Sequence, residues 1–318
     1  MRKLNSIYAV VLIAFLFVVV IVDVIRITWM SGMEVSADVS TDERSIETGS
    51  DLDSFFESTT DSLSQEQEYQ AALPEHLAGI KWRDTVDDVA LGKLLENVVL
   101  NGMTEAELLA RGKVIYLTFD DGPSKHTEEL LDILDRYQVK ATFFVTNGYP
   151  EYADCISEAA RRGHSIGIHC YSHWYEKIYA SEDAYLADMK KMDDIVFEQT
   201  GKRTKLMRFP GGSSNKVSKQ YNRGIMTRLE IIIEGMGYHY FDWNVDSMDA
   251  VGTTETDQVA QNVISVLEKK NVAVVLQHDS HGYSVAAVEK IISWGLENGY
   301  VFLPLTEESP GFHHGIVN

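Results

Sequence analysis

The chain has 318 residues, of which 45% are hydrophobic and 24% are charged, a composition typical of globular proteins. Its formal net charge of −20 argues against nucleic acid or an anionic membrane surface as the main partner. Two cysteines, Cys155 and Cys170, are too few for a disulfide scaffold, although an oxidising compartment would permit one bridge.

Residues 5–22 form an uncharged, apolar run of eighteen residues, which Arg2 and Lys3 precede. This length is at the short end for crossing a bilayer, and the basic residues place the N-terminus in the cytoplasm. A cleavable signal peptide is the alternative, because residues 35–37 (VSA) loosely resemble a cleavage site. We expect residues 1–30 to be a single-pass anchor in the cell membrane, with the rest of the chain outside the cytoplasm.

Residues 31–75 contain twelve acidic residues against one basic residue, and they are rich in serine and threonine. Such a stretch cannot bury enough apolar surface to offset its chain entropy, so we expect an acidic, disordered linker. Residues 76–110 carry helical patterns such as VDDVALGKLLENVV. They are expected to form a helical segment beside the domain that follows.

From residue 111 to residue 307, β-rich apolar runs alternate with amphipathic helical patterns. This alternation predicts an α/β domain with a parallel sheet, in which apolar strands are buried on both faces. The expected strands are residues 113–119, 140–146, 164–170, 206–211, 238–245, 272–279 and 300–305. Residues 308–318 are expected to be a C-terminal tail.

The ionisable residues of interest all lie at the carboxyl ends of these strands or directly after them. In parallel α/β folds, the loops at the carboxyl ends of the strands build the active site. We therefore expect one cluster at that end of the sheet. The candidates at the ends of the first, third, fourth, fifth and sixth expected strands are, in that order, Asp120 and Asp121; His169 and His173; Arg208; Asp246 and Asp249; His278.

Two features within this set indicate a metal site. Adjacent aspartates such as Asp120 and Asp121 disfavour each other's ionised form, although a tight turn would explain the pair equally simply. His169 and His173 are four residues apart, a spacing that lets both imidazoles face one point. Two histidines and one carboxylate commonly bind Zn²⁺ and leave a position for water. With Asp121 as that carboxylate, a cation would let Asp120 stay ionised as a base.

Five segments, TFDDGP, HCYSH, RFPGG, DSMD and LQH, occur in the order and spacing of the polysaccharide deacetylase family. This family is also known as the NodB-homology or family 4 carbohydrate esterase family. The resemblance covers roughly residues 111–305, and five ordered motifs are a specific signal. It implies a distorted, incompletely closed (β/α)7 barrel, in agreement with the seven expected strands.

The resemblance also implies roles for individual residues. The implied metal ligands are Asp121, His169 and His173, with Zn²⁺ as the expected ion and Co²⁺ or another transition metal as alternatives. The implied catalytic residues are Asp120 as the base, Arg208 as the arginine that orients it and lowers its pKa, His278 as the general acid and Asp249 as its partner. Leu276 would line the pocket for the acetyl methyl group, and Pro210 and Gly211 would also contact substrate.

Two positions depart from the family pattern. Cys170 stands where a serine or threonine usually follows the first ligand histidine, and its thiol could hold the loop less well or act as an extra soft ligand. Ala250 replaces a tryptophan, which puts the substrate preference in doubt without touching the reaction centre. The other late histidines, His281, His313 and His314, are expected to be ordinary surface residues.

The resemblance implies a metal-dependent hydrolase that releases acetate from an acetylated glycan polymer, with N-acetylglucosamine of peptidoglycan as the expected substrate. Another acetylated polymer, such as chitin, poly-N-acetylglucosamine or O-acetyl xylan, is the first alternative. A non-catalytic glycan-binding module that has kept the fold is the second. We expect a monomer.

Overall fold

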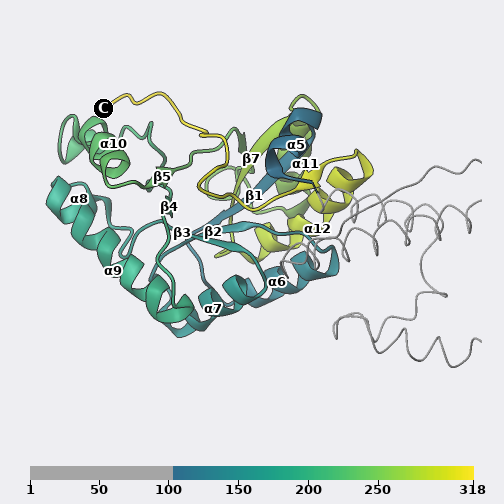
Figure 1. Ribbon diagram of the computed structural model, residues 1–318, viewed down its shortest axis with the longest axis horizontal. Helices are drawn as coiled ribbons and strands as arrows, with labels where there is room; N and C mark the ends of the chain where they lie inside the picture. Colours follow the sequence, from purple (N-terminus) through teal and green to yellow (C-terminus); the bar gives the residue numbers. More distant parts are fainter. Residues whose placement is uncertain (1–102) are drawn as a thin grey trace, which may run out of the picture. The chain divides into compact units, whose positions relative to one another are not determined.

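The computed structural model describes residues 103–318, and these residues form a curled, parallel sheet with helices on its outer side (Figure 1). The order of the strands is β5-β4-β3-β2-β1-β7-β6, and β8 also pairs with β1. Their bounds are β1 (Val114–Asp120), β2 (Thr142–Val145), β3 (Ser165–Ile168), β4 (Leu206–Met207), β5 (His239–Tyr240), β6 (Val245–Asp246), β7 (Val272–His278) and β8 (Val301–Phe302). The predicted parallel α/β class is confirmed.

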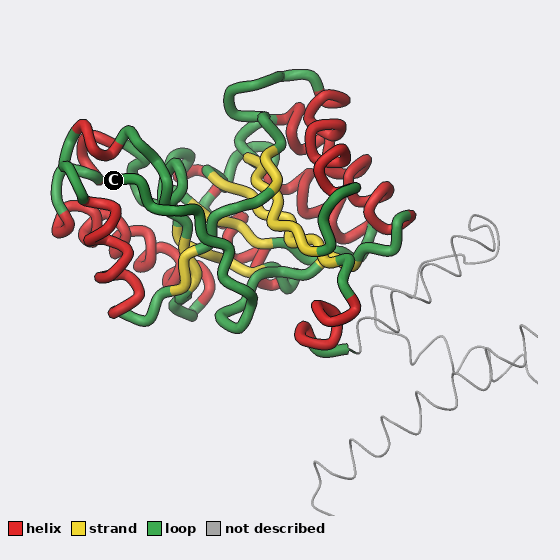
Figure 2. The backbone as a smooth tube through the Cα atoms, turned by 90° about the horizontal axis from the view of Figure 1, so that it is seen from above, coloured by secondary structure: helices red, strands yellow, loops and turns green. Residues whose placement is uncertain are grey.

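Helices surround the sheet, and Figure 2 shows them outside the strands. Helices α7 and α9 contact β3, and α12 contacts β7. The α-helices are α5 (Glu105–Arg111), α6 (Thr127–Arg136), α7 (Asp154–Arg161), α8 (Tyr175–Ile178), α9 (Glu182–Thr200), α10 (Ile225–Gly235), α11 (Thr256–Leu267) and α12 (Gly282–Glu297). Two short 3₁₀ helices, η1 (Pro150–Tyr152) and η2 (Ser218–Gln220), lie in loops.

Strand β1 shows how the core is divided. Ile115, Leu117 and Phe119 belong to a large apolar cluster that includes residues from α6, α7, α9, α11 and α12. Val114 and Tyr116 belong to a second, smaller cluster. Because successive side chains of a strand point to opposite faces, the first cluster lies between sheet and helices and the second on the inner face. Continuing the alternation, Asp120 also points inward, beyond the apolar layer.

The predicted strand 238–245 is wrong in one respect, because the structure splits it into β5 and β6. With this split, the sheet of the described residues has eight strands. β5 and β6 lie at opposite ends of the strand order and do not pair with each other, so the half-barrel remains open between them. The chain crosses from one to the other between Tyr240 and Val245. The carbonyl groups of Phe241 and Asp242 accept hydrogen bonds from the Arg208 side chain, and this contact replaces strand pairing there.

The predicted tail, residues 308–318, packs against this crossing segment. The backbone N–H of Asp242 donates to the carbonyl of Phe312 at 2.7 Å, and the N–H of His314 donates to the Asp242 carboxylate at 2.7 Å. Asp242 is fully buried. The tail therefore supplies the acceptor for the buried backbone N–H of Asp242 and a further donor for its carboxylate, which also accepts from Ser213.

Much of the predicted N-terminal organisation lies outside the described residues. This applies to the anchor at 1–30, the linker at 31–75 and most of the flanking segment at 76–110. The described end of that segment is helix α5, whose N-terminus is capped by a capping box formed by Thr104 and Glu107. None of the helices between residues 103 and 318 is long and apolar enough to cross a membrane. Cys155 and Cys170 are free thiols.

His164, just before β3, is buried, and its Nδ1 accepts a hydrogen bond from the backbone N–H of Ala141 at 3.1 Å. Burial lowers the pKa of His164 to about 4. The unfolded chain binds this proton near the ordinary histidine pKa, about 6.5. The neutral, buried imidazole of His164 therefore adds to the free energy of unfolding above about pH 6.5. This contribution is lost as the pH falls from about 6.5 to about 4.

Replacing His164 with glutamine should flatten this pH dependence. From pH 7 to pH 5, the parent protein should lose about 2 kcal/mol of unfolding free energy at this site, and His164→Gln should not. Urea unfolding at both pH values measures the difference, with His239→Gln at an exposed position as the control. Equal pH slopes for parent and His164→Gln would contradict the assignment.

Candidate active site

The carboxyl ends of four strands bring the candidate residues together. Asp120 ends β1 and His278 ends β7, and the two are register partners in the sheet. His169 follows β3, and Arg208 follows β4. The expected cluster at one end of the sheet is thus present.

Asp120 and Asp121 both reach this cluster although they are consecutive. Consecutive side chains of a strand point to opposite faces, so a continued β1 would turn Asp121 away from the cluster. Asp121 instead has φ 72°, in the left-handed region that non-glycine residues rarely adopt. The strand ends there and the carboxylate turns back. His173 has φ 53°, so the second histidine is also held in an unfavourable backbone conformation at the site.

Asp121, His169 and His173 form a compact group whose ligand atoms all lie within 4.8 Å of one another. Oδ1 of Asp121 is 3.6 Å from Nε2 of His169 and 3.5 Å from Nε2 of His173. This carboxylate oxygen is buried and has no hydrogen-bond donor. Burying a carboxylate oxygen without a hydrogen-bond donor costs free energy of folding. A positive charge placed between the three ligand atoms would remove this cost.

The tautomer of His169 supports the same conclusion. Its Nδ1 is 2.8 Å from the carbonyl oxygen of Arg208, which can only accept, so Nδ1 carries the proton. Burial lowers the pKa of His169 to about 3, so the ring is neutral. The lone pair of Nε2 therefore faces the lone pairs of Asp121. A divalent cation satisfies both, and the three residues fit a metal site of the two-histidine, one-carboxylate kind.

Arg208 is fully buried, and its guanidinium organises the centre of the site. Nη1 donates to Oδ1 of Asp120 at 2.8 Å and to the hydroxyl of Thr118 at 2.7 Å. Its Nε and Nη2 donate to the carbonyl groups of Phe241 and Asp242, in the segment that crosses from β5 to β6. Burial raises the pKa of Asp120, and the charge of Arg208 offsets part of that rise. Arg208 thus lowers the pKa of Asp120 as expected, but burial has the larger effect and leaves that pKa above its ordinary value.

His278 and Asp249 form a second polar unit beside the first. Nδ1 of His278 is 2.8 Å from Oδ1 of Asp249, and the backbone N–H of His278 donates to Oδ2. The hydroxyl of Ser284 also donates to Oδ2, at 2.6 Å. Burial opposes protonation of His278, but the hydrogen bond and charge of Asp249 raise the pKa of His278 to about 9. At neutral pH this imidazole can donate a proton.

The His278–Asp249 pair and the base Asp120 both lie close to the ligand group of Asp121, His169 and His173. Nε2 of His278 is 4.0 Å from Oδ2 of Asp121, and Nε2 of His169 is 4.0 Å from Oδ2 of Asp120. An acid, a base and a cation site therefore surround one small space. This arrangement can activate a water molecule, polarise a carbonyl group and protonate a leaving group.

The proposed substrate contacts are also at this end. Leu276 is two residues before His278 on β7, and so on the same face of that strand. The carbonyl of Pro210 accepts from the hydroxyl of Tyr179, and Pro210 is buried. Gly211 is exposed with φ 76°, and a Cβ there would approach the Tyr175 hydroxyl to 2.5 Å, so a side chain would strain the backbone and displace Tyr175.

Cys170 is 2% exposed, and burial raises the pKa of its thiol well above the ordinary value. The described ligand group does not include it. The loop it belongs to is held from outside, since the carboxylate of Asp188 on α9 accepts from the backbone N–H groups of Tyr171 and Ser172. Asp188 and Ser284 are supporting residues that motif spacing missed, because each looks like an ordinary polar residue on a helix.

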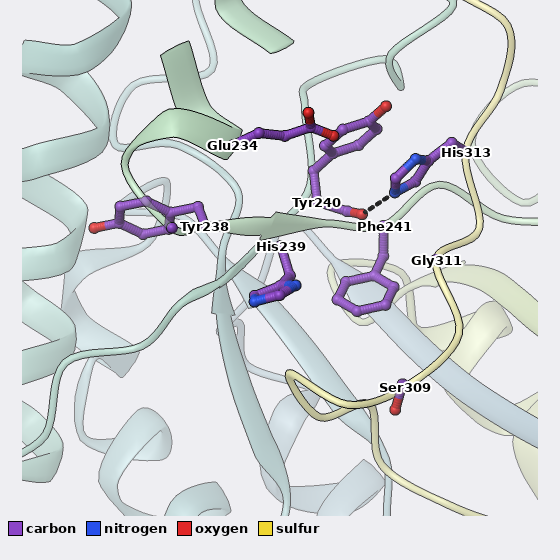
Figure 3. A pocket seen from close by; sticks show the side chains of 9 residues that line it. Glu234, Tyr238, His239, Tyr240, Phe241, Ser309, Gly311 and His313 are labelled. Carbon is purple, nitrogen blue, oxygen red and sulfur yellow. Dashed lines mark hydrogen bonds between the residues drawn. The ribbon is translucent and has the colours of Figure 1, made fainter. Parts of the chain in front are cut away.

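The three late histidines lie at the surface, as expected, and each also contacts an aromatic ring. His313 stacks on Tyr240 with ring centroids 3.9 Å apart, and its Nε2 lies 3.1 Å from the Tyr240 carbonyl, as Figure 3 shows. His314 contacts the carbonyl of Trp243. His281 stacks on Tyr283. The pocket in Figure 3 lies between β5 and the C-terminal tail and includes none of the candidate catalytic residues.

Comparison with known proteins identifies the family. A sequence model described as polysaccharide deacetylase matches residues 109–226. A peptidoglycan-N-acetylglucosamine deacetylase from Bacillus cereus is 37% identical over 203 residues, which are 62% of this chain and 71% of the relative. The chain belongs to the polysaccharide deacetylase family. As a member of this family, the protein described here is a deacetylase, a hydrolase that acts on carbon–nitrogen bonds other than peptide bonds.

Two further relatives of this deacetylase are informative. The crystal structure of the catalytic domain of a peptidoglycan N-acetylglucosamine deacetylase from Eubacterium rectale matches with a TM-score of 0.64 and 55% identity, over 65% of this chain and 94% of that one. A chitin deacetylase from Colletotrichum lindemuthianum is 30% identical over 227 residues, covering 63% of this chain and 87% of its own length. The curled half-barrel is thus the fold of solved deacetylases.

Proposed function

We propose that this deacetylase removes the N-acetyl group from N-acetylglucosamine residues of peptidoglycan and releases acetate. The observation that carries the chemistry is that the lone pairs of Asp121 and His169 face each other and need a cation, beside the carboxylate of Asp120, which is outside the ligand group. The assignment of the substrate rests on two bacterial relatives, 37% and 55% identical to this chain, both of which are named for this reaction.

In the proposed reaction, Asp120 accepts a proton from the water molecule that attacks the acetamide carbonyl carbon. Arg208 holds the carboxylate of Asp120 in place. A cation bound by Asp121, His169 and His173 would polarise the carbonyl and lower the pKa of that water. His278 then protonates the departing amine, because an amide nitrogen is otherwise a poor leaving group. Asp249 keeps His278 protonated and aimed at the site.

The remaining assignments concern the metal and the acetyl group. Two imidazoles and one carboxylate favour Zn²⁺, with Co²⁺ as a functional substitute. Leu276 would contact the acetyl methyl group, and the turn at Pro210 and Gly211 would line the same pocket. Because glycine has no side chain, the backbone at position 211 can approach a ligand closely.

Acetate release from purified peptidoglycan tests the proposal directly. Protein supplied with Zn²⁺ or Co²⁺ should release acetate, and chelator-treated protein should not. Parallel assays with chitin oligomers, poly-N-acetylglucosamine and O-acetyl xylan identify the preferred polymer. Faster release from one of these would replace peptidoglycan as the substrate, and binding without release from any polymer would indicate a non-catalytic module.

Replacing His173 with alanine should reduce metal occupancy itself. The variant loses one of three protein ligands, so we expect at least about tenfold weaker metal binding and a matching loss of activity. Elemental analysis after dialysis measures the occupancy, with His313→Ala as the control. Full metal content in an inactive His173→Ala protein would remove this histidine from the ligand set.

We also propose that the catalytic domain acts outside the cytoplasm, held by the apolar run at residues 5–22. Peptidoglycan lies outside the membrane, and the acidic stretch at residues 31–75 is long enough to separate domain and membrane. Protease treatment of intact cells that carry the full chain tests this. Digestion of the domain supports the proposal, and protection in intact cells with digestion after lysis contradicts it.

A further inference from the structure

Residues 201–228 contain eight basic residues and no acidic residue, although the chain as a whole carries a net charge of −20. The loop between β4 and α10 contains three of these basic residues, Lys216, Lys219 and Arg223, and all three are exposed. We call residues 214–224 the basic loop. The proposed reaction uses none of its side chains.

The cations of the basic loop are not neutralised by carboxylates of the domain. Arg208 and Arg228, in the same stretch of sequence, form ion pairs with Asp120 and Glu182. The three basic side chains of the loop form no ion pair with any carboxylate among residues 103–318. Three like charges in a short loop repel one another, so an external anion that binds there would lower their electrostatic free energy.

Buried polar side chains hold the backbone of the basic loop in place. The side-chain amide of Asn215 donates to the carbonyl of Gly212 at 2.9 Å, and its side-chain oxygen accepts from the backbone N–H of Ser218 at 3.0 Å. Ser218 is fully buried, and its carbonyl accepts from the N–H of Asn222 at 3.0 Å. The amide of Asn222 donates in turn to the carbonyl of Ala180 at 3.2 Å. A backbone fixed before binding lowers the entropy cost of ordering the loop around a ligand.

Two residues connect the basic loop with the metal-ligand group. A Cβ at Gly211 would lie 2.5 Å from the Tyr175 hydroxyl and 3.2 Å from Cβ of Asn215, so Gly211 is close to both. The Tyr175 ring packs edge-on against the ring of His173, with ring centroids 5.5 Å apart. A polymer whose reacting group is at the ligand site can therefore reach the basic loop with a neighbouring substituent.

The side chains of the basic loop match the chemistry of a peptide that carries carboxylates. Lysine and arginine donate charge-assisted hydrogen bonds to carboxylate oxygens. Val217 and Tyr221, which alternate with the cations along the loop, are 42% and 43% exposed and offer apolar contacts. A phosphate group would use the cations but not these apolar side chains, and an uncharged glycan would not use the cations.

We propose that the basic loop binds the carboxylate groups of the peptides that peptidoglycan carries. This inference rests on the proposed function in that the substrate is peptidoglycan, whose glycan strands are substituted with such peptides. Lys216, Lys219 and Arg223 bind the carboxylates, and Val217 and Tyr221 contact the apolar parts of the peptide. The loop then favours peptide-bearing glycan over uncharged polymers such as chitin.

Soluble peptidoglycan fragments of four sugars test the proposal by binding. They are compared with the same fragments after their carboxylates have been converted to amides, and both are prepared free of phosphate-linked polymers. Calorimetry uses metal-loaded Asp120→Asn protein to avoid hydrolysis during the titration. This protein should bind the unmodified fragments about tenfold more tightly than the amidated ones at low salt, and high salt should reduce the difference.

Removing the three charges should remove this preference. In the same background, Lys216→Gln, Lys219→Gln and Arg223→Gln together should bind both kinds of fragment with affinities within about twofold of each other. The matched control removes three exposed cations that lie towards the amino ends of the strands, and it should keep the preference. Its changes are Arg136→Gln, Lys202→Gln and Lys269→Gln.

Three results would overturn the role of the basic loop. They are equal affinity of the Asp120→Asn protein for unmodified and amidated fragments, an equal loss of the preference in the control, and tighter binding only of fragments that keep phosphate-linked polymers. Acetate release by the parent protein is a separate test. Carboxylate-dependent binding through the basic loop without acetate release from any glycan would support the loop and refute the proposed function, and acetate release without carboxylate dependence would do the reverse.

Discussion

Replacing Asp120 with asparagine is expected to lower kcat about a thousandfold while metal content stays at the level of the parent. Asparagine keeps the shape of the side chain and can still accept from Arg208, but it cannot take a proton from water at neutral pH. Asp120 is not a member of the ligand group formed by Asp121, His169 and His173. Steady-state kinetics and elemental analysis on the same preparation measure both effects.

The control for this variant is Asp194→Asn, which changes an exposed aspartate on α9 in the same way. It should keep full activity and full metal content. Loss of the metal from the Asp120→Asn protein would contradict the assignment, because it would make Asp120 a ligand. Retained activity would contradict it as well, because another group would then have to act as the base.

Replacing Arg208 with methionine is expected to destabilise the fold by about 3–5 kcal/mol and to abolish activity. Arg208 is 0% exposed, and its partner Asp120 is 3% exposed. Removing the guanidinium leaves a buried carboxylate without its cation and leaves the carbonyl groups of the crossing segment without donors. Urea unfolding of the metal-free proteins measures the loss without a contribution from metal binding.

Two comparisons sharpen this test. Arg136→Met removes an exposed ion pair with Glu289 and should cost less than about 1 kcal/mol. The double variant Asp120→Asn/Arg208→Met should lose less stability than the two single variants added together, because the buried charge is then gone. Simple additivity, or an Arg208→Met protein as stable as the parent, would show that the buried pair does not support the fold.

Much of the catalytic end was predictable because of one property of parallel sheets. All strands end on the same side, so residues such as Asp120, His169 and His278 must lie at the same edge of the sheet. The strand runs themselves were visible as apolar, β-branched stretches. The resemblance to the deacetylase family added the roles of base, acid and metal ligand. The positions of these residues at the strand ends do not by themselves show which residue has which role.

The break between β5 and β6 was not predictable in the same way. The stretch YHYFDWNV reads as one continuous strand by its apolar and aromatic content. Its pairing is interrupted by Arg208, whose side chain binds the carbonyls of Phe241 and Asp242 from more than thirty positions away. Local propensity contains no information about such a donor.

The amino-acid order by itself determined the alternation of strands and helices, the order of the motifs and the types of ligand, acid and base that are present. The tertiary structure alone decided that Asp121 turns back beside Asp120 and that Ser284 and Asp188 hold the site from helices. These features depend on left-handed backbone angles and on contacts between segments far apart in the chain. Such contacts are set by packing, so no local pattern of residues encodes them.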